Sequence, residues 1–181
     1  MMRHWKRYLK ALFLFIMTFG FSQPALAQAG TIVSVDPAYL EVDPGEMFSV
    51  DVVVTDVVDL YGFDVKITYD PEIITFDHFD FGDFVDDGIS FTISHDPGCV
   101  QFVRSQISPS DPKTGSGILV TLNFVANQVD GESDLILELV ELSTADGDLI
   151  PMDAVDGFVQ VGAPKAETET YLPLIMVNAG K

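Results

Sequence analysis

The stretch Asp59–Phe76 constrains the fold more than any other part of the chain, because apolar and polar side chains alternate through it. Successive side chains of a β-strand point to opposite faces, so this alternation predicts a strand with one apolar and one polar face. The pair Asp70-Pro71 ends the strand, since proline has no amide hydrogen to donate. The apolar positions are Tyr61, Phe63, Val65, Ile67 and Tyr69, and the polar positions are Gly62, Asp64, Lys66 and Thr68. We expect the apolar set to be buried and the polar set to be open to a partner.

Short apolar runs separated by turn residues continue along the chain. Asp56–Asp59 is expected to link a preceding strand to the alternating one, and Ile73–Phe76 is expected to be a strand. Asp77–Gly88 mixes aromatic and acidic residues and is expected to be a long loop, followed by a strand over Ile89–Ser94. Ser108–Gly117 is expected to form turns throughout. About nine strands and no helical period predict an all-β sandwich or jelly roll.

Both ends of the chain differ from this strand-rich region. Residues 1–27 have a basic start, an apolar centre and the small-residue ending Ala25-Leu26-Ala27, which predicts a secretory signal peptide cleaved after Ala27. Residues 28–161 form the expected sandwich, and residues 162–181 are a polar linker and the short apolar tail YLPLIMV. Neither apolar run reaches the roughly 20 residues of a spanning helix. We expect a secreted protein, extracellular or at the cell surface, whose mature chain has no membrane span and whose tail is either loosely docked or a sorting or attachment signal.

The charge of the chain is strongly negative. It has 9 basic and 28 acidic residues, and the leader removes four of the basic ones, so the mature net charge is 5 − 28 = −23. A chain of this charge is repelled by phosphate backbones and by anionic membrane surfaces, which excludes nucleic acid as a partner. Cys99 is the single cysteine, so the chain has neither an internal disulfide nor a thiolate metal site.

Catalytic patterns find little support in the sequence. Gly115-Ser116-Gly117 does not have the G-x-S-x-G pattern and lies in a turn-rich stretch rather than between a strand and a helix. His78 and His95 each lie in or beside an expected loop, where a lone histidine is usually solvated. Among 28 acids some pair meets the carboxylate spacing of a glycosidase by chance, so that spacing has no weight. We therefore predict that the protein is not an enzyme and needs no cofactor.

The acidic residues of the expected loop raise the question of a calcium site. An EF-hand loop over Asp83–Ser94 would need acids at positions 1, 3 and 5 and a glutamate at position 12, and Val85 and Ser94 break that pattern. A calcium site of another kind remains a weak alternative to a hydrated acidic loop. Its ligands would come from Asp77, Asp80, Asp83, Asp86 and Asp87.

Carbohydrate binding is the main rival to protein binding. Sugar platforms use exposed planar aromatic rings, but Trp5, the single tryptophan, lies in the leader. Tyr39, Tyr61 and Tyr69 qualify only if they face outward, and the alternation places the last two inward. A structural cell-surface protein attached through its tail is a further alternative.

Several stretches in a fixed order resemble the cohesin domain, the receptor module of bacterial cellulosomes. These are VSVDPAYLEVDPGEMFSVDVVV, then LYGFDVKITYDPEIITF, then GSGILVTLNFVA, and finally a turn containing Asp-Gly before the strand VQV. The resemblance covers about Thr31 to Val161. It implies a nine-stranded jelly-roll sandwich related to carbohydrate-binding modules.

The resemblance also implies a function, the non-catalytic docking of a dockerin. A dockerin is a small calcium-loaded helical module carried by another secreted protein, here in polysaccharide degradation or surface assembly. In the family it lies on a sheet face that includes the alternating strand, where Asp64 matches an acidic contact residue of many cohesins. Gly62 stands where many of them have a hydrogen-bonding asparagine, so this chain departs from the pattern there. The polar positions Gly62, Asp64, Lys66 and Thr68 are the expected partner contacts.

Overall fold

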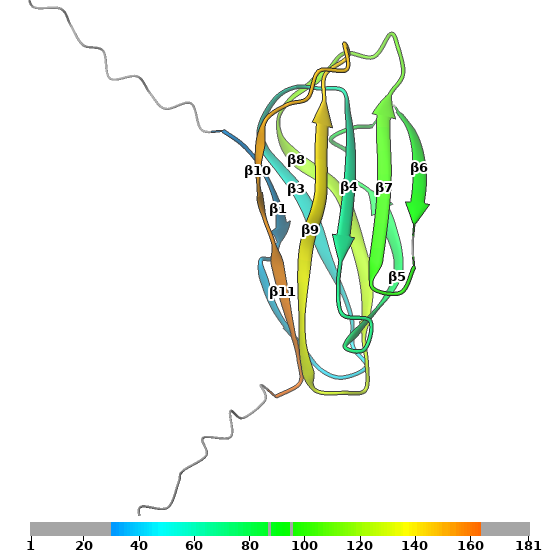
Figure 1. Ribbon diagram of the computed structural model, residues 1–181, viewed down its shortest axis with the longest axis vertical. Coiled ribbons are helices and arrows are strands. Elements are labelled where there is room, and N and C mark those ends of the chain that lie inside the picture. The colour runs from blue at the N-terminus through cyan, green and yellow to red at the C-terminus, as the bar shows by residue number, and fades with distance from the viewer. Residues whose placement is uncertain (1–29, 87, 95, 164–181) are drawn as a thin grey trace, which may run out of the picture.

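The computed structural model describes residues 30–163 apart from residues 87 and 95. The expected signal peptide, most of the linker and the apolar tail lie outside the described residues. Two β-sheets pack face to face along the whole length of the described part, and Figure 1 shows no helix in it. None of the described residues therefore forms a helix that could cross a membrane. The all-β sandwich predicted from the sequence is confirmed.

The described residues form eleven strands rather than about nine. One sheet has the order β10-β1-β3-β8-β5 and the other the order β2-β11-β9-β4-β7-β6. Most neighbours are antiparallel, whereas β1 pairs with β10 and β2 with β11 in parallel. The strands are β1 (Thr31–Asp36), β2 (Tyr39–Val42), β3 (Met47–Leu60), β4 (Gly62–Thr68), β5 (Ile74–Phe81), β6 (Gly88–Ser94), β7 (Cys99–Gln106), β8 (Lys113–Ala126), β9 (Gly131–Ser143), β10 (Met152–Val155) and β11 (Gly157–Val161).

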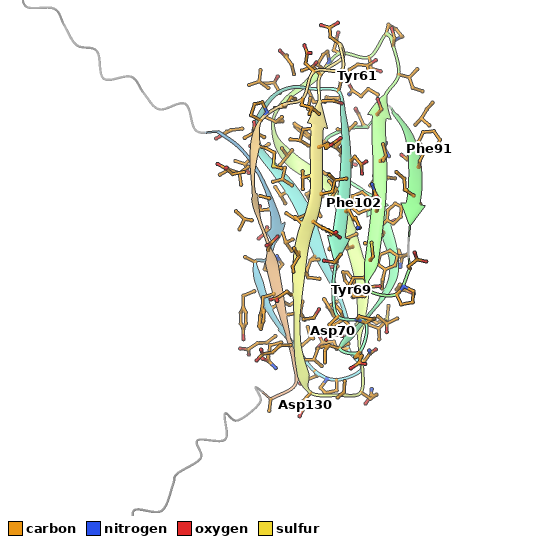
Figure 2. The ribbon with its side chains drawn as sticks, viewed as in Figure 1. Tyr61, Tyr69, Asp70, Phe91, Phe102 and Asp130 are labelled. Atoms are coloured by element: carbon orange, nitrogen blue, oxygen red, sulfur yellow. The ribbon has the colours of Figure 1, made fainter. Side chains whose placement is uncertain are left out.

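The core lies between the two sheets and is filled by aliphatic and aromatic side chains from both. Val52 and Phe124 come from the first sheet and Val65 and Phe102 from the second, and all four are fully buried. Figure 2 shows Phe102 midway along the length of the molecule. Such a core removes apolar surface from water at about 25 cal/mol per Å², which is the main favourable term in folding.

Three stretches expected to be loops are partly strand. Asp77–Phe81 continues β5, paired with β8, and only residues 82–86 and the residue outside the description separate it from β6. Lys113–Gly117 likewise belongs to β8. Asp56–Asp59 stays within β3, where Asp56 and Asp59 adopt positive φ angles of 53° and 58° at irregularities of the β3–β8 register. These predictions are wrong because main-chain pairing with a long neighbour overrides the local preference of acidic and turn residues.

Strand β10 is the element that sequence reasoning missed. Its four residues are mostly exposed and show no alternation. It is held by parallel main-chain pairing with β1, from Thr31 opposite Met152 to Ser34 opposite Val155. Since backbone hydrogen bonds are independent of side-chain type, such an edge strand leaves little signal in the sequence.

Candidate protein-docking face

Strand β4 lies inside the six-stranded sheet, between β9 and β7, and has the two-faced character that its sequence predicts. Phe63, Val65 and Ile67 face the core and are 3%, 0% and 0% exposed. Asp64 and Lys66 are half-buried on the outer face. Tyr69, at the end of the alternation, packs edge-on against Phe124 with ring centroids 5.3 Å apart. The structure therefore places the expected polar positions on the outer face, although their role as contacts stays a prediction.

Neighbouring strands hold the two charged side chains of β4 in place. The amide of Gln101 on β7 donates to both carboxylate oxygens of Asp64, at 2.9 and 3.2 Å. On the other side, Lys66 Nζ lies 2.7 Å from the Glu138 carboxylate of β9. The hydrogen bond to Glu138 and the charge of that carboxylate raise the pKa of Lys66, and partial desolvation opposes this rise. Lys66 is thus paired within the sheet, while Asp64 is oriented by a neutral donor.

Gly62 and Thr68 contribute less accessible surface than their sequence positions imply. Gly62 is buried in a notch, where a Cβ atom would lie 3.2 Å from the Arg104 carbonyl oxygen and from the hydroxyl oxygens of Ser105 and Ser143. Thr68 is half-buried and stands opposite Cys99. Of the four expected contacts, Asp64 and Lys66 are therefore the two that bring charge to the outer face.

An apolar row on β6 lies on the same outer face, and sequence reasoning did not place it there. Ile89, Phe91 and Ile93 are 49%, 60% and 58% exposed. Phe91 stands opposite Val103 of β7, which in turn stands opposite Asp64, and directly opposed residues of a sheet share one face. Figure 2 shows Phe91 at the margin of the molecule. The only sequence signal was the alternation of Ile89–Ser94, which gives the period of the strand but not the face that is buried.

Together these residues form what we call the docking face, the outer surface of β9, β4, β7 and β6. A polar stripe on β4 runs between the apolar row of β6 and Ile136 of β9, which is 43% exposed opposite Thr68. The face carries both charge signs beside apolar side chains. Its defining residues are Asp64, Lys66, Ile89, Phe91, Val103 and Ile136.

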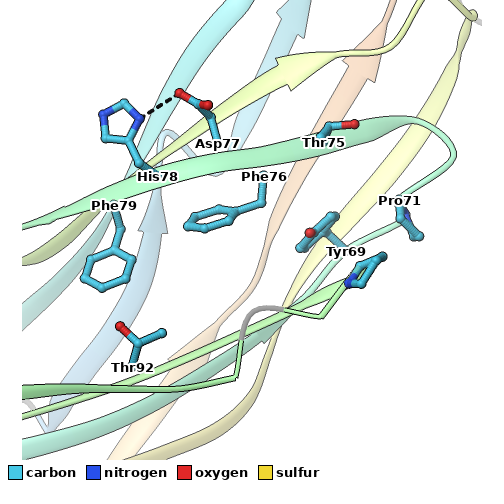
Figure 3. A pocket seen from close by; sticks show the side chains of 9 residues that line it. Tyr69, Pro71, Thr75, Phe76, Asp77, His78, Phe79 and Thr92 are labelled. Atoms are coloured by element: carbon cyan, nitrogen blue, oxygen red, sulfur yellow. Dashed lines mark hydrogen bonds and ion pairs between the residues drawn. The ribbon is translucent and has the colours of Figure 1, made fainter.

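A groove opens between the edges of the two sheets, where β5 and β6 approach each other (Figure 3). It has a volume of about 640 Å³. Figure 3 shows Phe79 pointing from β5 toward Thr92 and the ring of His78, also part of the lining, on the other side of β5. The His78 ring lies 2.7 Å from the Asp77 carboxylate, and the lining contains no serine or cysteine that it could activate. His95, the other histidine considered, lies outside the described residues.

The acidic residues considered for calcium are dispersed. Asp77 is bound to His78, and Asp80 extends from β5 toward Asn123. The Asp86 carboxylate lies 2.5 Å from Lys113 Nζ, and its backbone carbonyl accepts a hydrogen bond from Arg104 at 2.8 Å. Asp83 is exposed, and Asp87 lies outside the described residues. Within the described ranges no three histidine, cysteine, aspartate or glutamate side chains form a group suited to a metal ion.

Of the three tyrosines considered for sugar binding, Tyr39 faces outward. It is 53% exposed on β2 and stacks on Phe158 of β11, with ring centroids 5.8 Å apart and planes 9° apart. Its hydroxyl donates to Glu41 at 2.6 Å, and this hydrogen bond raises the pKa of Tyr39. Tyr61 and Tyr69 are both half-buried, so these three tyrosines do not form a continuous exposed row.

Solved structures with this fold include cohesins. A non-cellulosomal cohesin from the archaeon Archaeoglobus fulgidus superposes with a TM-score of 0.65 at 15% identity, covering 75% of this chain and 93% of its own. CaCohA2 from Clostridium acetobutylicum gives 0.63 at 22% identity, covering 73% and 90%. A type I cohesin–dockerin complex from Clostridium thermocellum, Coh-OlpA–Doc918, gives 0.62 at 16% identity, covering 74% and 99%. At these identities the likeness is one of fold.

Sequence comparison supplies the family. No curated protein sequence matches the chain significantly. The model of the cohesin domain matches residues 33–161, which run from β1 to the end of β11 and make up more than half of the chain. The resemblance of the ordered stretches to cohesins is thereby confirmed, and this chain belongs to the cohesin domain family.

Proposed function

We propose that this chain is a secreted, non-catalytic module that binds a dockerin-bearing protein through its docking face. The observation that carries the proposal is the exposed apolar row Ile89–Phe91–Ile93 beside the oriented carboxylate of Asp64, in a chain of the cohesin family. The Clostridium thermocellum relative is described as a cohesin in complex with a dockerin, which supports the same class of partner here. Polysaccharide degradation or surface assembly is the setting that such a partner implies.

The two parts of the docking face have different tasks in this proposal. Burial of Ile89 and Phe91 against apolar side chains of the partner supplies affinity, because buried aromatic and aliphatic anchors dominate interface energies. Asp64 supplies register, since its carboxylate is already held by Gln101 and loses little freedom on binding. The face therefore combines an apolar anchor along its β6 edge with a polar neighbour on β4.

Charge favours a basic partner surface. Between residues 30 and 163 the basic residues are Lys66, Arg104 and Lys113, and each is bound within the molecule. Asp64 and Glu138 thus leave the docking face with negative potential. A partner that presents lysine or arginine is drawn to it, and such attraction weakens as salt shortens the Debye length.

The decisive experiment is calorimetric titration of the chain with dockerin-bearing proteins of its own organism, with calcium and with chelator. We expect binding that requires calcium, since the dockerin is the calcium-loaded member. Phe91→Ala and Asp64→Ala should each weaken it at least about tenfold, the range of interface hot spots. Met47→Ala is the matched control, because Met47 is 67% exposed but lies on β3 of the other sheet. Binding to none of these proteins, or equal losses for Met47→Ala and Phe91→Ala, would refute the proposal.

Glycan binding at Tyr39 is a second candidate, favoured by one observation. The Tyr39 ring is exposed, and its orientation is fixed by the stack on Phe158 and the hydrogen bond to Glu41. Such a fixed ring can support one sugar face. Retention of the chain on insoluble polysaccharide, abolished by Tyr39→Ala but not by Phe91→Ala, would favour this function over protein docking.

A further inference from the structure

The edge strand β6 differs from the three other sheet edges. Strands β2 and β10 have four residues each, and β5 contains Asp77, His78 and Asp80 together with a register irregularity. Short length, charged residues and irregular pairing are the means by which sheet edges avoid pairing with other chains. Gly88–Ser94 is seven residues long and contains neither a charged residue nor a proline. Its one protection is an irregularity between Thr92 and Ser94.

We propose that two copies of this chain pair edge to edge through β6, antiparallel, to form one continuous sheet. In such a pair, with the two-fold axis perpendicular to the sheet, the outer faces of both copies lie on the same side. Residues that point outward then oppose one another, so Ile89 and Phe91 meet the apolar residues of the second copy. Ser90 meets Ser90 of the second copy and Thr92 meets Gly88, so no charge enters the contact. The alternation of β6 therefore makes this strand complementary to itself over Gly88–Thr92, the regular part of its pairing with β7.

The surroundings of β6 favour a second copy over a charged partner strand. Arg104 of β7 is turned inward from the edge: its guanidinium donates to Ser90 Oγ at 3.1 Å and to the Asp86 carbonyl at 2.8 Å. The central carbon of the Arg104 guanidinium lies 4.7 Å from the centre of the Phe81 ring. The nearby Lys113 is bound to Asp86. In a chain with 28 acids, a seven-residue edge without any charge selects a neutral strand of the same pattern.

The proposed pair and the proposed docking share the side chains of Ile89 and Phe91 but differ in the rest of the contact. Pairing also uses the backbone N–H and C=O groups at the free edge of β6, while docking also uses Asp64 on the outer face of β4. A contact of one strand with another is smaller than a standard protein interface, so we expect association on the order of 100 µM. Both copies are strongly negative, hence salt should strengthen the pair, whereas it should weaken binding of a basic partner.

Sedimentation equilibrium of the purified chain alone, from about 10 to 1,000 µM, tests the pair. We expect the average mass to rise from one chain toward two, with a higher association constant at higher salt. Phe91→Lys adds a charge at the edge, in the manner of natural edge strands, and should weaken association at least about tenfold. Ile136→Lys is the control, because it charges the same outer face on β9, three strands away from the edge.

Three results would overturn the inference. One is a single-chain mass at the highest concentration, and another is growth beyond two chains without a plateau. The third is an equal loss of association in Phe91→Lys and Ile136→Lys, which would place the contact on the face rather than on the edge. Circular dichroism of each variant shows whether the sandwich is intact, and Ile93→Lys, at a side chain 58% exposed, provides a second edge variant if Phe91→Lys does not fold.

Discussion

Strands β4 and β6 have the same length and the same alternation, but they turn opposite kinds of side chain toward the core side of the sheet. Each has seven residues in which apolar positions alternate with glycine or polar ones. In β4 the apolar set is buried, from Phe63 at 3% exposure to Ile67 at 0%, whereas in β6 Phe91 is 60% exposed. Two equal patterns thus produce a core strand and an exposed row within one sheet.

The reason lies in register and in neighbours. Val103 of β7 stands opposite Phe91 on one side and Asp64 on the other, so the apolar side of β6 shares a face with the polar side of β4. On the inner side of β6, Ser90 binds Arg104 and Thr92 lines the groove with Phe79. Alternation therefore sets the period of a strand, while its pairing decides which half of the pattern meets the core.

The largest difference between the two strands should appear in stability. We expect Ile67→Ala in β4 to lower the free energy of unfolding by about 2–5 kcal/mol, because it leaves a cavity in a fully packed core. Ile93→Ala in β6 should change it by less than about 0.5 kcal/mol, since that side chain is mostly in water already. Urea unfolding monitored by fluorescence measures both. Similar losses for the two variants would mean that β6 packs against the body after all.

A medium effect is expected at Gly62, which is buried in a notch of the outer face. Gly62→Asn introduces a Cβ atom 3.2 Å from the Arg104 carbonyl and two serine hydroxyls, and should destabilise the fold by about 1–3 kcal/mol through overpacking. Gly30→Asn is the matched control: the Gly30 Cβ position has no neighbour within 4 Å, and its φ lies outside the left-handed region. The two unfolding midpoints in urea should differ clearly. An unchanged unfolding midpoint for Gly62→Asn would show that the notch widens without strain.

The smallest effect concerns the ion pair between β4 and β9. The pKa of Lys66 is raised above its ordinary value of 10.5, so its contribution to stability is complete below that value and is lost only as the pH rises through the raised pKa. The difference in melting temperature between the chain and Lys66→Met should accordingly be constant from about pH 6 to 9 and shrink at higher pH. Thermal unfolding in a series of buffers measures it. A difference that vanishes already near neutral pH would contradict the pairing with Glu138.

The groove between β5 and β6 adds a contrast of its own. Phe79 lies in the stretch that was expected to be a loop, yet its ring lines the groove beside Phe76 and packs on Phe102 with centroids 5.6 Å apart. Phe79→Ala should destabilise the fold by about 3 kcal/mol or more if it acts as a core residue. The exposed neighbour Asp80→Ala should be close to neutral in the same unfolding experiment. A larger loss of stability for Asp80→Ala than for Phe79→Ala would support the interpretation of this stretch as a loop.

The sequence by itself determined the elements that depend on local pattern. The alternation through Tyr61–Tyr69 predicted strand β4 with its buried and outer faces, and the ordered stretches predicted the cohesin family. Asp70-Pro71 predicted the end of that strand, and β4 does end at Thr68, just before this pair. These features are legible because side-chain period and turn chemistry act over a few residues.

Only the tertiary structure decided what depends on partners distant in the chain. In the structure Asp77–Phe81 is part of a strand, and β10 pairs with β1. Ser105 and Ser143 surround Gly62, and the side chains of Ile89 and Phe91 are exposed on the same face as Asp64. Each of these outcomes follows from the register between strands that lie far apart in sequence. A shift of one residue in that register exchanges the two faces of a strand, and no local pattern contains that information.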